Sequence, residues 1–292
     1  MACVDVRELV KTFTRRPAPW SRGAVVRAVD GVSFTIAEGE TFGLVGESGS
    51  GKTTTGRCML RLIEPTSGSF ALRGEEVFGL PPARLRALRR DMQMVFQDPD
   101  SSLNPRMRAG AIVEEGLIVH GLGTRSERRD RVLQLFSLVG LDAGQRDRYP
   151  HEFSGGQRQR IGLARALALS PCFLIADEPV SALDVSIQAQ IINMLMDLQQ
   201  QLRLTLLVVV HDLRLVRHIC PRVAVMYRGR IVEMGSTDAI FRGPAHPYTR
   251  ALLSAMPDPD PEAHRRRIVF DPASVDPGAP LRDVEPGHFA AI

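Results

Sequence analysis

The chain has 292 residues, enough for one large α/β domain with additions or for two small domains. Its composition is ordinary for a folded protein, with 44% hydrophobic and 24% charged residues. The net charge of +4 is mild for this length and argues against a dedicated nucleic-acid-binding protein. The four cysteines are far apart in the sequence, so they indicate reduced thiols rather than a zinc or iron–sulfur site.

The N-terminal residues predict β-structure. Residues 4–13 and 25–36 are strand-like by alternation and β-branching, and the proline-containing segment 15–23 between them predicts a loop. The first residues carry charges rather than a continuous apolar core, so we expect no signal peptide. No apolar run approaches the roughly 18 residues needed to span a bilayer. The longest, residues 204–210, has the length of a buried strand.

A glycine-rich loop follows the apolar run at residues 41–45 and opens into a helix-like stretch at 52–63. This strand–loop–helix order is the context that a phosphate-binding loop requires. Glycines let backbone N–H groups close around phosphates, and the helix N-terminus adds partial positive charge. We expect Lys52 to reach the β- and γ-phosphates and the Thr53 hydroxyl to bind Mg²⁺. The nucleotide-binding residues expected here are Gly46, Glu47, Ser48, Gly49, Ser50, Gly51, Lys52, Thr53 and Thr54.

The middle of the chain changes character. Strands are predicted at residues 69–72 and 93–96, with a basic helical stretch at 82–91 between them. From about residue 98 to 140 strand-like runs disappear, and helical spacing predicts a helical insertion. That spacing is clearest at Val132, Leu135, Phe136 and Val139. A glycine turn at 153–157 then starts another helix, with Ser154 as its N-cap.

Polar side chains follow three of the predicted strands. Asp177 and Glu178 end the apolar strand at 172–176, at the edge where α/β sheets bind ligands. We expect Asp177 to bind Mg²⁺, directly or through water, and Glu178 to polarise an attacking water. Gln97 ends the strand at 93–96 and is expected to bind Mg²⁺ and water. His211 ends the strand at 204–210 and is expected to contact the γ-phosphate and the water.

The C-terminal part predicts a long helix at 186–202 whose apolar face, Ile187, Ile191, Leu195, Leu198 and Leu202, is ordinary core packing. Residues 223–227 and 230–233 predict a hairpin around Arg228-Gly229. After residue 256 the chain is rich in proline and aspartate. A basic triplet at 265–267, interpreted as solvated surface, and a weakly patterned tail follow.

Together these motifs resemble an ATP-binding-cassette (ABC) ATPase, because they stand in that family's order over roughly residues 4–256. They are GESGSGKT at 46–53, Gln97, FSGGQ at 153–157, FLIADE at 173–178, SALD at 181–184 and His211. Phe153 departs from the leucine of many cassettes, while Ser154, Gly156 and Gln157 are intact.

Within the family the chain resembles ATPase subunits of oligopeptide, dipeptide and nickel importers. The segments on which this resemblance rests are MQMVFQDPDSSLNPRM at 92–107, RYPHEFSGGQRQRIGLARAL at 148–167, SALDVSIQAQIINML at 181–195 and HPYTRALLSAMP at 246–257.

The resemblance implies an α/β P-loop NTPase fold of the ABC type, with a mixed sheet core, an antiparallel β subdomain and a helical insertion. We expect an ATPase domain at 1–256, with a helical subdomain at about 98–168, and a partly irregular importer-type C-terminal extension at 257–292. The resemblance also implies that Phe13 stacks on adenine. No cysteine follows Cys220, so we expect no iron–sulfur cluster of the kind that some relatives carry. The signature residues expected to bind nucleotide are Ser154, Gly155, Gly156 and Gln157.

The expected activity is ATP hydrolysis, with ATP and Mg²⁺ bound, that powers uptake of oligopeptides or dipeptides. In the family that the chain resembles, the hydrolysis site lies between two cassettes; one chain carries one phosphate loop and one signature, so we expect a second ABC ATPase subunit. The resemblance to the peptide importers implies a paralogue rather than a copy. The resemblance also implies two transmembrane permeases, which contact Gln97 and residues 98–107, and an extracytoplasmic peptide-binding protein reached through them. The expected location is peripheral, on the cytoplasmic face of the inner membrane, with no nucleic acid bound.

Three alternatives stay open. The first is an ABC importer for another solute, such as nickel, glutathione, murein peptides or an oligosaccharide, because the ATPase does not touch the solute. The second is a soluble cassette that acts on nucleic acid, against which the single cassette and the low net charge argue. The third is an inactive regulatory subunit, against which the intact Glu178 and His211 argue.

Overall fold

The computed structural model describes residues 2–14, 25–181, 183–256 and 268–292. The chain divides into two compact units: unit 1 contains residues 1–78 and 208–292, and unit 2 contains residues 79–207. The loop predicted at 15–23 and the basic triplet at 265–267 lie outside the described residues.

Unit 1 contains an antiparallel sheet with the strand order β2-β1-β4-β5. Alternation along β1 buries Val4 and Val6 on one face, and β1 pairs with β2 on one side and β4 on the other. The predicted strands at 4–13, 25–36 and 69–72 are therefore confirmed. The strands of this sheet are β1 (Ala2–Thr14), β2 (Val25–Ala37), β4 (Ser67–Leu72) and β5 (Glu75–Glu76).

The second sheet of unit 1 is mixed, because β3 pairs with β9 in parallel whereas β9 and β10 are antiparallel. Arg228 and Gly229, with φ of 45° and 87°, form the predicted turn between β9 and β10. Two such positive φ values are what a tight two-residue hairpin needs. The strand order is β11-β12-β10-β9-β3-β8, and the boundary between the units falls within β8. These strands are β3 (Thr41–Val45), β8 (Thr205–Val210), β9 (Arg222–Tyr227), β10 (Arg230–Ser236), β11 (Leu281–Glu285) and β12 (His288–Ala291).

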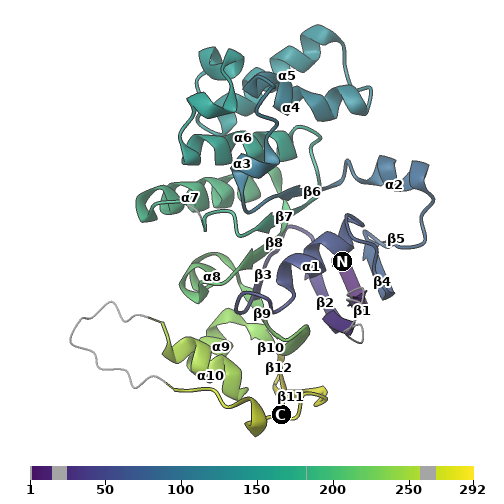
Figure 1. The fold of residues 1–292 in the computed structure, drawn as a ribbon, viewed down its shortest axis with the longest axis vertical. Helices are drawn as coiled ribbons and strands as arrows, with labels where there is room; N and C mark the ends of the chain where they lie inside the picture. The colour runs from purple at the N-terminus through teal and green to yellow at the C-terminus, as the bar shows by residue number, and fades with distance from the viewer. Residues whose placement is uncertain (1, 15–24, 182, 257–267) are drawn as a thin grey trace, which may run out of the picture. The chain divides into compact units, whose positions relative to one another are not determined.

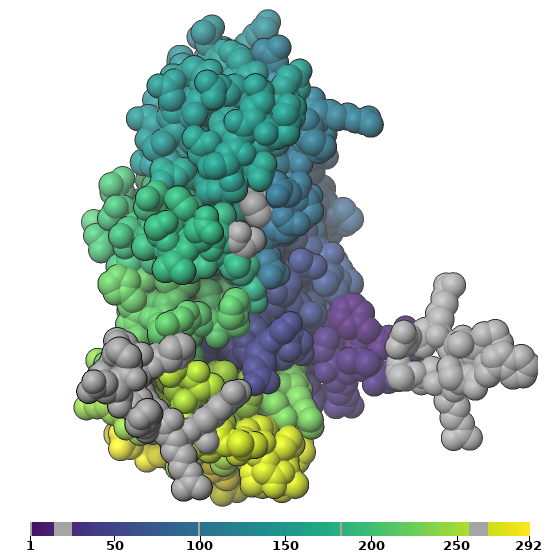
Figure 2. Space-filling view, turned by 60° about the vertical axis from the view of Figure 1, so that its left-hand side comes forward, coloured from purple at the N-terminus to yellow at the C-terminus, as the bar shows by residue number. Residues whose placement is uncertain are grey.

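Two strands in the C-terminal tail are absent from the sequence-based expectation. β12 pairs antiparallel with β10, with Glu233 opposite Ala290 and Met234 opposite Phe289, and β11 pairs with β12. The tail is weakly patterned because most of β11 is exposed, so the edge of β10, rather than a local pattern, decides its structure. In Figure 2 yellow atoms of the tail lie next to yellow-green atoms of unit 1.

The helices of unit 1 follow the strands of its mixed sheet. α1 begins directly after the glycine-rich loop that follows β3, and two residues separate the end of β8 from the start of α8. α9 and α10 come after β10, and Figure 1 shows them close to it. The helices are α1 (Lys52–Met59), α8 (Leu213–Ile219), α9 (Thr237–Arg242), α10 (Pro247–Ser254) and the 3-10 turn η3 (Pro272–Ser274).

Unit 2 contains two parallel strands, β6 (Met92–Val95) and β7 (Phe173–Asp177). All five residues of β7 are buried, as expected for a strand covered on both faces. The long helix α7 (Val185–Leu202) buries Ile191, Leu195 and Leu198 as predicted, but Leu202 is 45% exposed. The predicted apolar stripe is therefore wrong at its last position, where the helix ends.

Apart from these strands and the first residues of β8, the secondary-structure elements described in unit 2 are helical. α4, α5 and α6 pack on one another, as Figure 1 shows. The spacing that predicted a helix at 126–139 is confirmed, because Val132, Leu135 and Phe136 are buried there. Among the described residues, no helix is both long and apolar enough to cross a membrane. The helices are α2 (Pro82–Leu88), α3 (Pro99–Ser102), α4 (Ala109–Val119), α5 (Arg125–Leu138), α6 (Gly155–Leu167), η1 (Ala143–Asp147) and η2 (Pro150–Glu152).

Candidate functional site

The glycine-rich loop of unit 1 lies tightly against neighbouring backbone. A Cβ atom at Gly46 would lie 2.2 Å from the Met226 carbonyl oxygen, and one at Gly51 would lie 2.2 Å from that of Ala28. Both glycines also have φ in the range that L side chains rarely adopt, 153° and 107°. The sequence needs glycine at these two positions because β2 and β9 leave no room for a side chain.

The start of α1 has the properties of an anion site. Its N-cap, Gly51, provides no side-chain hydrogen bond, so no cap competes with a ligand for the first backbone N–H groups. Lys52 is buried, and its Nζ donates to the carbonyl oxygens of Gly46 (2.6 Å) and Glu47 (2.9 Å). The ammonium group thus lies over the loop, where phosphates would bind.

Other predicted nucleotide-binding residues of unit 1 lie close to this loop in sequence or on its flanking strands. Thr53 and Thr54 are half-buried at the start of α1, and Glu47, Ser48 and Gly49 are exposed. Phe13 lies on β1 with 42% of its surface exposed, and Lys11 Nζ lies 4.9 Å from its ring centroid. An aromatic face that is open to solvent can stack on a base.

His211 is exposed and directly follows β8, which is the neighbour of β3 in the sheet. The next residue, Asp212, caps α8 by accepting from Arg214 N. Burial raises the pKa of Asp212, but hydrogen bonds from the Arg214 side chain and backbone outweigh it and leave this pKa below its usual value. The backbone after His211 is therefore fixed by a charged cap.

In unit 2, the polar residues at the ends of β6 and β7 meet. Gln97 Nε2 donates to Glu178 Oε2 over 2.9 Å, which leaves the amide oxygen of Gln97 as an acceptor for another group. Asp177 is fully buried at the end of β7. Glu178 has a φ of 44°, which is uncommon for a residue with a Cβ and marks a site held by its surroundings.

The signature residues form the start of α6. Ser154 Oγ accepts from Gln157 N (3.3 Å), and Gln157 Oε1 accepts from Ser154 N (3.0 Å), so both side chains form a capping box. A Cβ at Gly156 would lie 2.6 Å from a side-chain carbon of Ile187, which explains why this position has no side chain. The prediction that Ser154 is an N-cap is confirmed.

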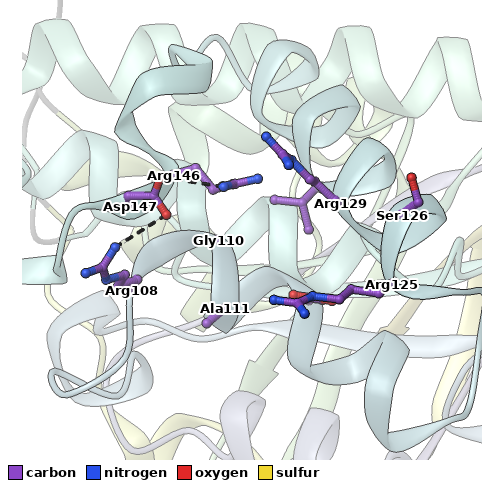
Figure 3. Close-up of a pocket in the computed structure, with 10 residues that line it drawn as sticks. Arg108, Gly110, Ala111, Arg125, Ser126, Arg129, Arg146 and Asp147 are labelled. Atoms are coloured by element: carbon purple, nitrogen blue, oxygen red, sulfur yellow. Dashed lines mark ion pairs between the residues drawn. The ribbon is translucent and has the colours of Figure 1, made fainter.

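Unit 2 also contains a pocket with a volume of about 460 Å³ between α4, α5 and η1. Four arginines line it, and Figure 3 shows their labelled side chains around the cavity. Asp147 pairs with both Arg108 (3.6 Å) and Arg146 (3.5 Å). Arg125 and Arg129 form no ion pair within the described residues. The pocket therefore has surplus positive charge.

Sequence reasoning assigned no role to two features of the structure. One is this arginine pocket, whose members are scattered between residues 108 and 146. The other is Tyr248, whose hydroxyl accepts a hydrogen bond from Glu47 N over 3.0 Å, across 201 positions of the chain. The sequence HPY at 246–248 was part of the resemblance, but local pattern does not reveal its contact with the loop.

Comparisons with known proteins agree with this geometry. Residues 29–181 match the family described as ABC transporter, and residues 232–279 match the C-terminal region of oligopeptide/dipeptide transporters. The dipeptide transport ATP-binding protein DppF of Lactococcus lactis is 50% identical, over 98% of this chain and 92% of that protein. The oligopeptide transport ATP-binding protein OppF of Bacillus subtilis is 52% identical, over 90% of this chain and 89% of that protein.

Solved structures lead to the same class. An ATP-binding cassette solved as a dimer in a post-hydrolysis state, bound to ADP and Pi, is 30% identical, with a TM-score of 0.71. The match covers 80% of this chain and 98% of that one.

A phosphate-binding loop on a mixed sheet, in a chain that also contains an antiparallel sheet and a helical region, is typical of a P-loop ATPase cassette. With the matches above, the chain belongs to the ABC transporter family, and its predicted fold class is confirmed.

Proposed function

We propose that this chain is the ATP-hydrolysing subunit of an importer that takes up oligopeptides or dipeptides through partner permeases. One observation carries the proposal. The ABC transporter family and the C-terminal region of oligopeptide/dipeptide transporters both match this one chain, at residues 29–181 and 232–279. The relatives named dipeptide and oligopeptide transport ATP-binding proteins match nearly the whole chain, which supports transfer of the substrate class.

Unit 1 would bind the nucleotide. In the loop from Gly46 to Thr54, the backbone N–H groups nearest the start of α1 surround the β- and γ-phosphates, and the uncapped helix start adds partial positive charge. Lys52 leaves the Gly46 and Glu47 carbonyls and turns its ammonium group to the phosphates. The exposed ring of Phe13 stacks on adenine.

Hydrolysis needs a positioned water. Glu178 accepts a proton from the water as it attacks the γ-phosphorus, and the bond to the β–γ bridging oxygen breaks, giving ADP and phosphate. The hydrogen bond from Gln97 holds the Glu178 carboxylate in one orientation. His211 donates to a γ-phosphate oxygen and so stabilises the charge that develops there.

The residues present suit Mg²⁺, which accompanies ATP in phosphoryl transfer and neutralises phosphate charge. The described residues contain no group of three or more His, Cys, Asp or Glu that could hold a metal ion by itself. Mg²⁺ is usually bound by one or two protein oxygens together with phosphate oxygens. Thr53 Oγ1, the Gln97 amide oxygen and the Asp177 carboxylate are donors of that kind.

The active form would be a dimer of cassettes. The start of α6, with Ser154, Gly155, Gly156 and Gln157, is a second anion-binding helix end in the same chain. We propose that it binds the nucleotide held by a partner ATPase subunit, which is a paralogue rather than a copy. ATP then favours the closed dimer because both subunits bind it there.

The permeases would dock on unit 2, at residues 98–107 and the neighbouring arginine pocket. The pocket begins at Arg108, the residue after that segment, and Arg125 and Arg129 carry charge that the described residues do not neutralise. A cytoplasmic permease segment with a carboxylate would complement it, because Arg–carboxylate pairs are strong and can be bidentate. Bound to the permeases in this way, the chain would lie peripherally at the cytoplasmic face of the inner membrane.

Affinity purification tests the assembly. The tagged chain is extracted from native membranes in mild detergent, and co-purifying proteins are identified by mass spectrometry. Two permeases, a second ATPase subunit and an extracytoplasmic peptide-binding protein are expected. Recovery with ribosomes or nucleic acid, and without permeases, would contradict the transport function while leaving the ATPase chemistry intact.

A charge-reversed variant, Arg125→Glu with Arg129→Glu, tests the docking pocket. We expect it to lose the permeases but to bind ATP like the wild type. The matched control is Arg282→Glu on the exposed strand β11, which makes the same type of charge change in unit 1. Equal recovery of permeases with all three proteins would exclude the pocket as the docking site.

A further inference from the structure

The His-Pro-Tyr sequence at 246–248 builds the start of α10. His246 Nδ1 accepts from Tyr248 N over 3.1 Å and caps the helix, and Pro247 occupies the first turn, where its missing N–H is not needed. Glu233 on β10 accepts from the backbone N–H groups of Ala245 (2.7 Å) and His246 (3.1 Å). The N-terminal end of α10 is thereby fixed to β10.

The tail strand β12 reinforces the same point. His288 Nε2 lies 2.7 Å from Glu233 Oε1, and both side chains are buried. The carboxylate of Glu233 thus joins β10, β12 and the start of α10. This buried carboxylate has three hydrogen-bond partners, all of them protein groups. Because these bonds are directional and come from different elements, they hold α10 in one position.

The side chain of Tyr248 is buried in a cluster of aromatic rings. It is 2% exposed, and its ring lies 4.5 Å from the ring of Tyr227 and 5.3 Å from that of Phe270, centroid to centroid. Phe270, which follows α10 in the sequence, also packs edge-on against Tyr227, with ring centroids 5.2 Å apart. Three rings in mutual contact leave the Tyr248 side chain a single orientation, so the position of its hydroxyl is determined.

That hydroxyl accepts from the backbone N–H of Glu47, the second residue of the phosphate-binding loop, over 3.0 Å. Burial raises the pKa of Tyr248 to about 12, so the group is a neutral hydroxyl at physiological pH. On the carbonyl side, Lys52 Nζ binds Gly46 O and Glu47 O. The first turn of the loop is thus held by two side chains, one from the start of α1 and one from α10.

These two contacts have different fates when nucleotide binds. Lys52 is the group proposed to turn toward the phosphates, and in doing so it gives up its bonds to the Gly46 and Glu47 carbonyls. The Tyr248 contact uses only the N–H of Glu47, in the first turn of the loop, and leaves the N–H groups at the start of α1 to the phosphates, so it can persist. A loop that stays ordered when its lysine leaves binds ligand with a smaller entropy loss.

We infer that Tyr248 is a positioning residue for the phosphate-binding loop, through which the C-terminal region sets the affinity of the cassette for nucleotide. This inference rests on the proposed ATP-binding function. The inference gives residues 232–279, which match the C-terminal region of oligopeptide/dipeptide transporters, a role in nucleotide binding by the cassette. The aromatic cluster of Tyr227, Tyr248 and Phe270 is the structure that transmits this effect to Glu47.

The test is Tyr248→Phe, which keeps the ring and removes only the hydroxyl. The purified full-length chain is titrated with fluorescent mant-ATP, and thermal unfolding is followed in parallel. Loss of the hydrogen bond that holds the Glu47 N–H is expected to weaken nucleotide binding about 3- to 10-fold, with Tm nearly unchanged. In the assembled transporter, KM for ATP should rise by a similar factor while kcat stays close to that of the wild type.

The matched control is Tyr227→Phe. Tyr227 belongs to the same aromatic cluster, but its hydroxyl forms no hydrogen bond within the described part of the chain. This variant should bind mant-ATP as the wild type does.

Wild-type affinity in Tyr248→Phe would overturn the inference, as would an equal loss in both variants, which would indicate packing rather than the hydroxyl. A wild-type chain that binds no mant-ATP would instead overturn the proposed function.

Discussion

The two helix starts that carry the nucleotide-binding motifs differ in how their first backbone N–H groups are capped. α1 begins at Gly51 without any side-chain cap, whereas α6 begins with a complete capping box between Ser154 and Gln157. Both ends offer backbone N–H groups and partial positive charge. The start of α1 is therefore open to a ligand in a single chain, and the start of α6 is stable without one.

This difference matches the proposed division of labour. A chain must bind ATP before it can dimerise around it, so its own phosphate site should be ready. The signature acts only when a partner brings a nucleotide, so it benefits from a cap that keeps the helix end ordered meanwhile. The following predictions test this contrast in order of decreasing expected effect.

The largest effect is expected from Glu178→Gln, which separates binding from chemistry. An amide cannot take the proton of the attacking water, so ATP turnover of the assembled complex should fall by about 10²- to 10⁴-fold. ATP should still bind at α1 and now trap the closed dimer, which size-exclusion chromatography with light scattering would detect. Turnover close to that of the wild type would refute the role of Glu178.

Lys52→Ala should act on the open helix start. Removal of the ammonium group deprives the phosphates of a charged partner in a water-poor site, and we expect nucleotide affinity of the single chain to fall tenfold or more. Titration of the purified chain with mant-ATP measures it. Arg61→Ala, which removes the cation of a partly exposed pair with Glu64, is the control and should bind normally. Unchanged affinity in Lys52→Ala would contradict its role.

Ser154→Ala should act on the capped helix start, and in a different way. Loss of the cap should lower the free energy of unfolding by about 1 kcal/mol. Mant-ATP affinity of the single chain should not change, but nucleotide-dependent dimerisation of the assembled pair should weaken. Denaturant unfolding and light scattering measure the two effects. Weaker binding by the single chain would remove the distinction between the two helix starts.

Much of this contrast could be predicted from the sequence. Glycine spacing after an apolar run located the loop before α1, and Ser154 three residues before Gln157 located the cap of α6, because both are local patterns. Strand β7 and the Asp177-Glu178 pair were predicted for the same reason. The meeting of Gln97 with Glu178 followed from parallel strands that end at one edge.

The rest depends on tertiary contacts that leave little local trace. β11 and β12 form because the edge of β10 is available, although their own residues alternate weakly. The contact of Tyr248 with Glu47 spans 201 positions, and the arginine pocket collects side chains from α4, α5 and η1. The exposed end of α7 at Leu202 shows the converse, since an apolar stripe does not by itself state where burial stops.

The smallest expected effect is a dependence of stability on pH. It arises at His246, which caps α10, the helix whose Tyr248 contacts the loop before α1. Burial lowers the pKa of His246, with a raising influence from Glu233 and a further lowering one from Arg250. Its Nδ1 must be unprotonated to cap α10 at Tyr248 N. Since the folded-state pKa lies below the unfolded value of about 6.5, the unfolded chain binds more protons in between. The stabilisation by His246 is thus complete above pH 6.5 and lost as pH falls through the folded-state pKa.

Comparison with His246→Asn isolates this contribution, because asparagine can cap a helix but does not titrate. The groups that face His246 are Glu233, which His288 contacts, and Arg250, and all three remain in the variant. We expect Tm to fall by a few degrees more in the wild type than in the variant between pH 7.5 and 5.5. A parallel decline in the two proteins would show that the acid sensitivity of α10 lies elsewhere, and that the support of Tyr248 for the loop does not depend on the protonation of His246.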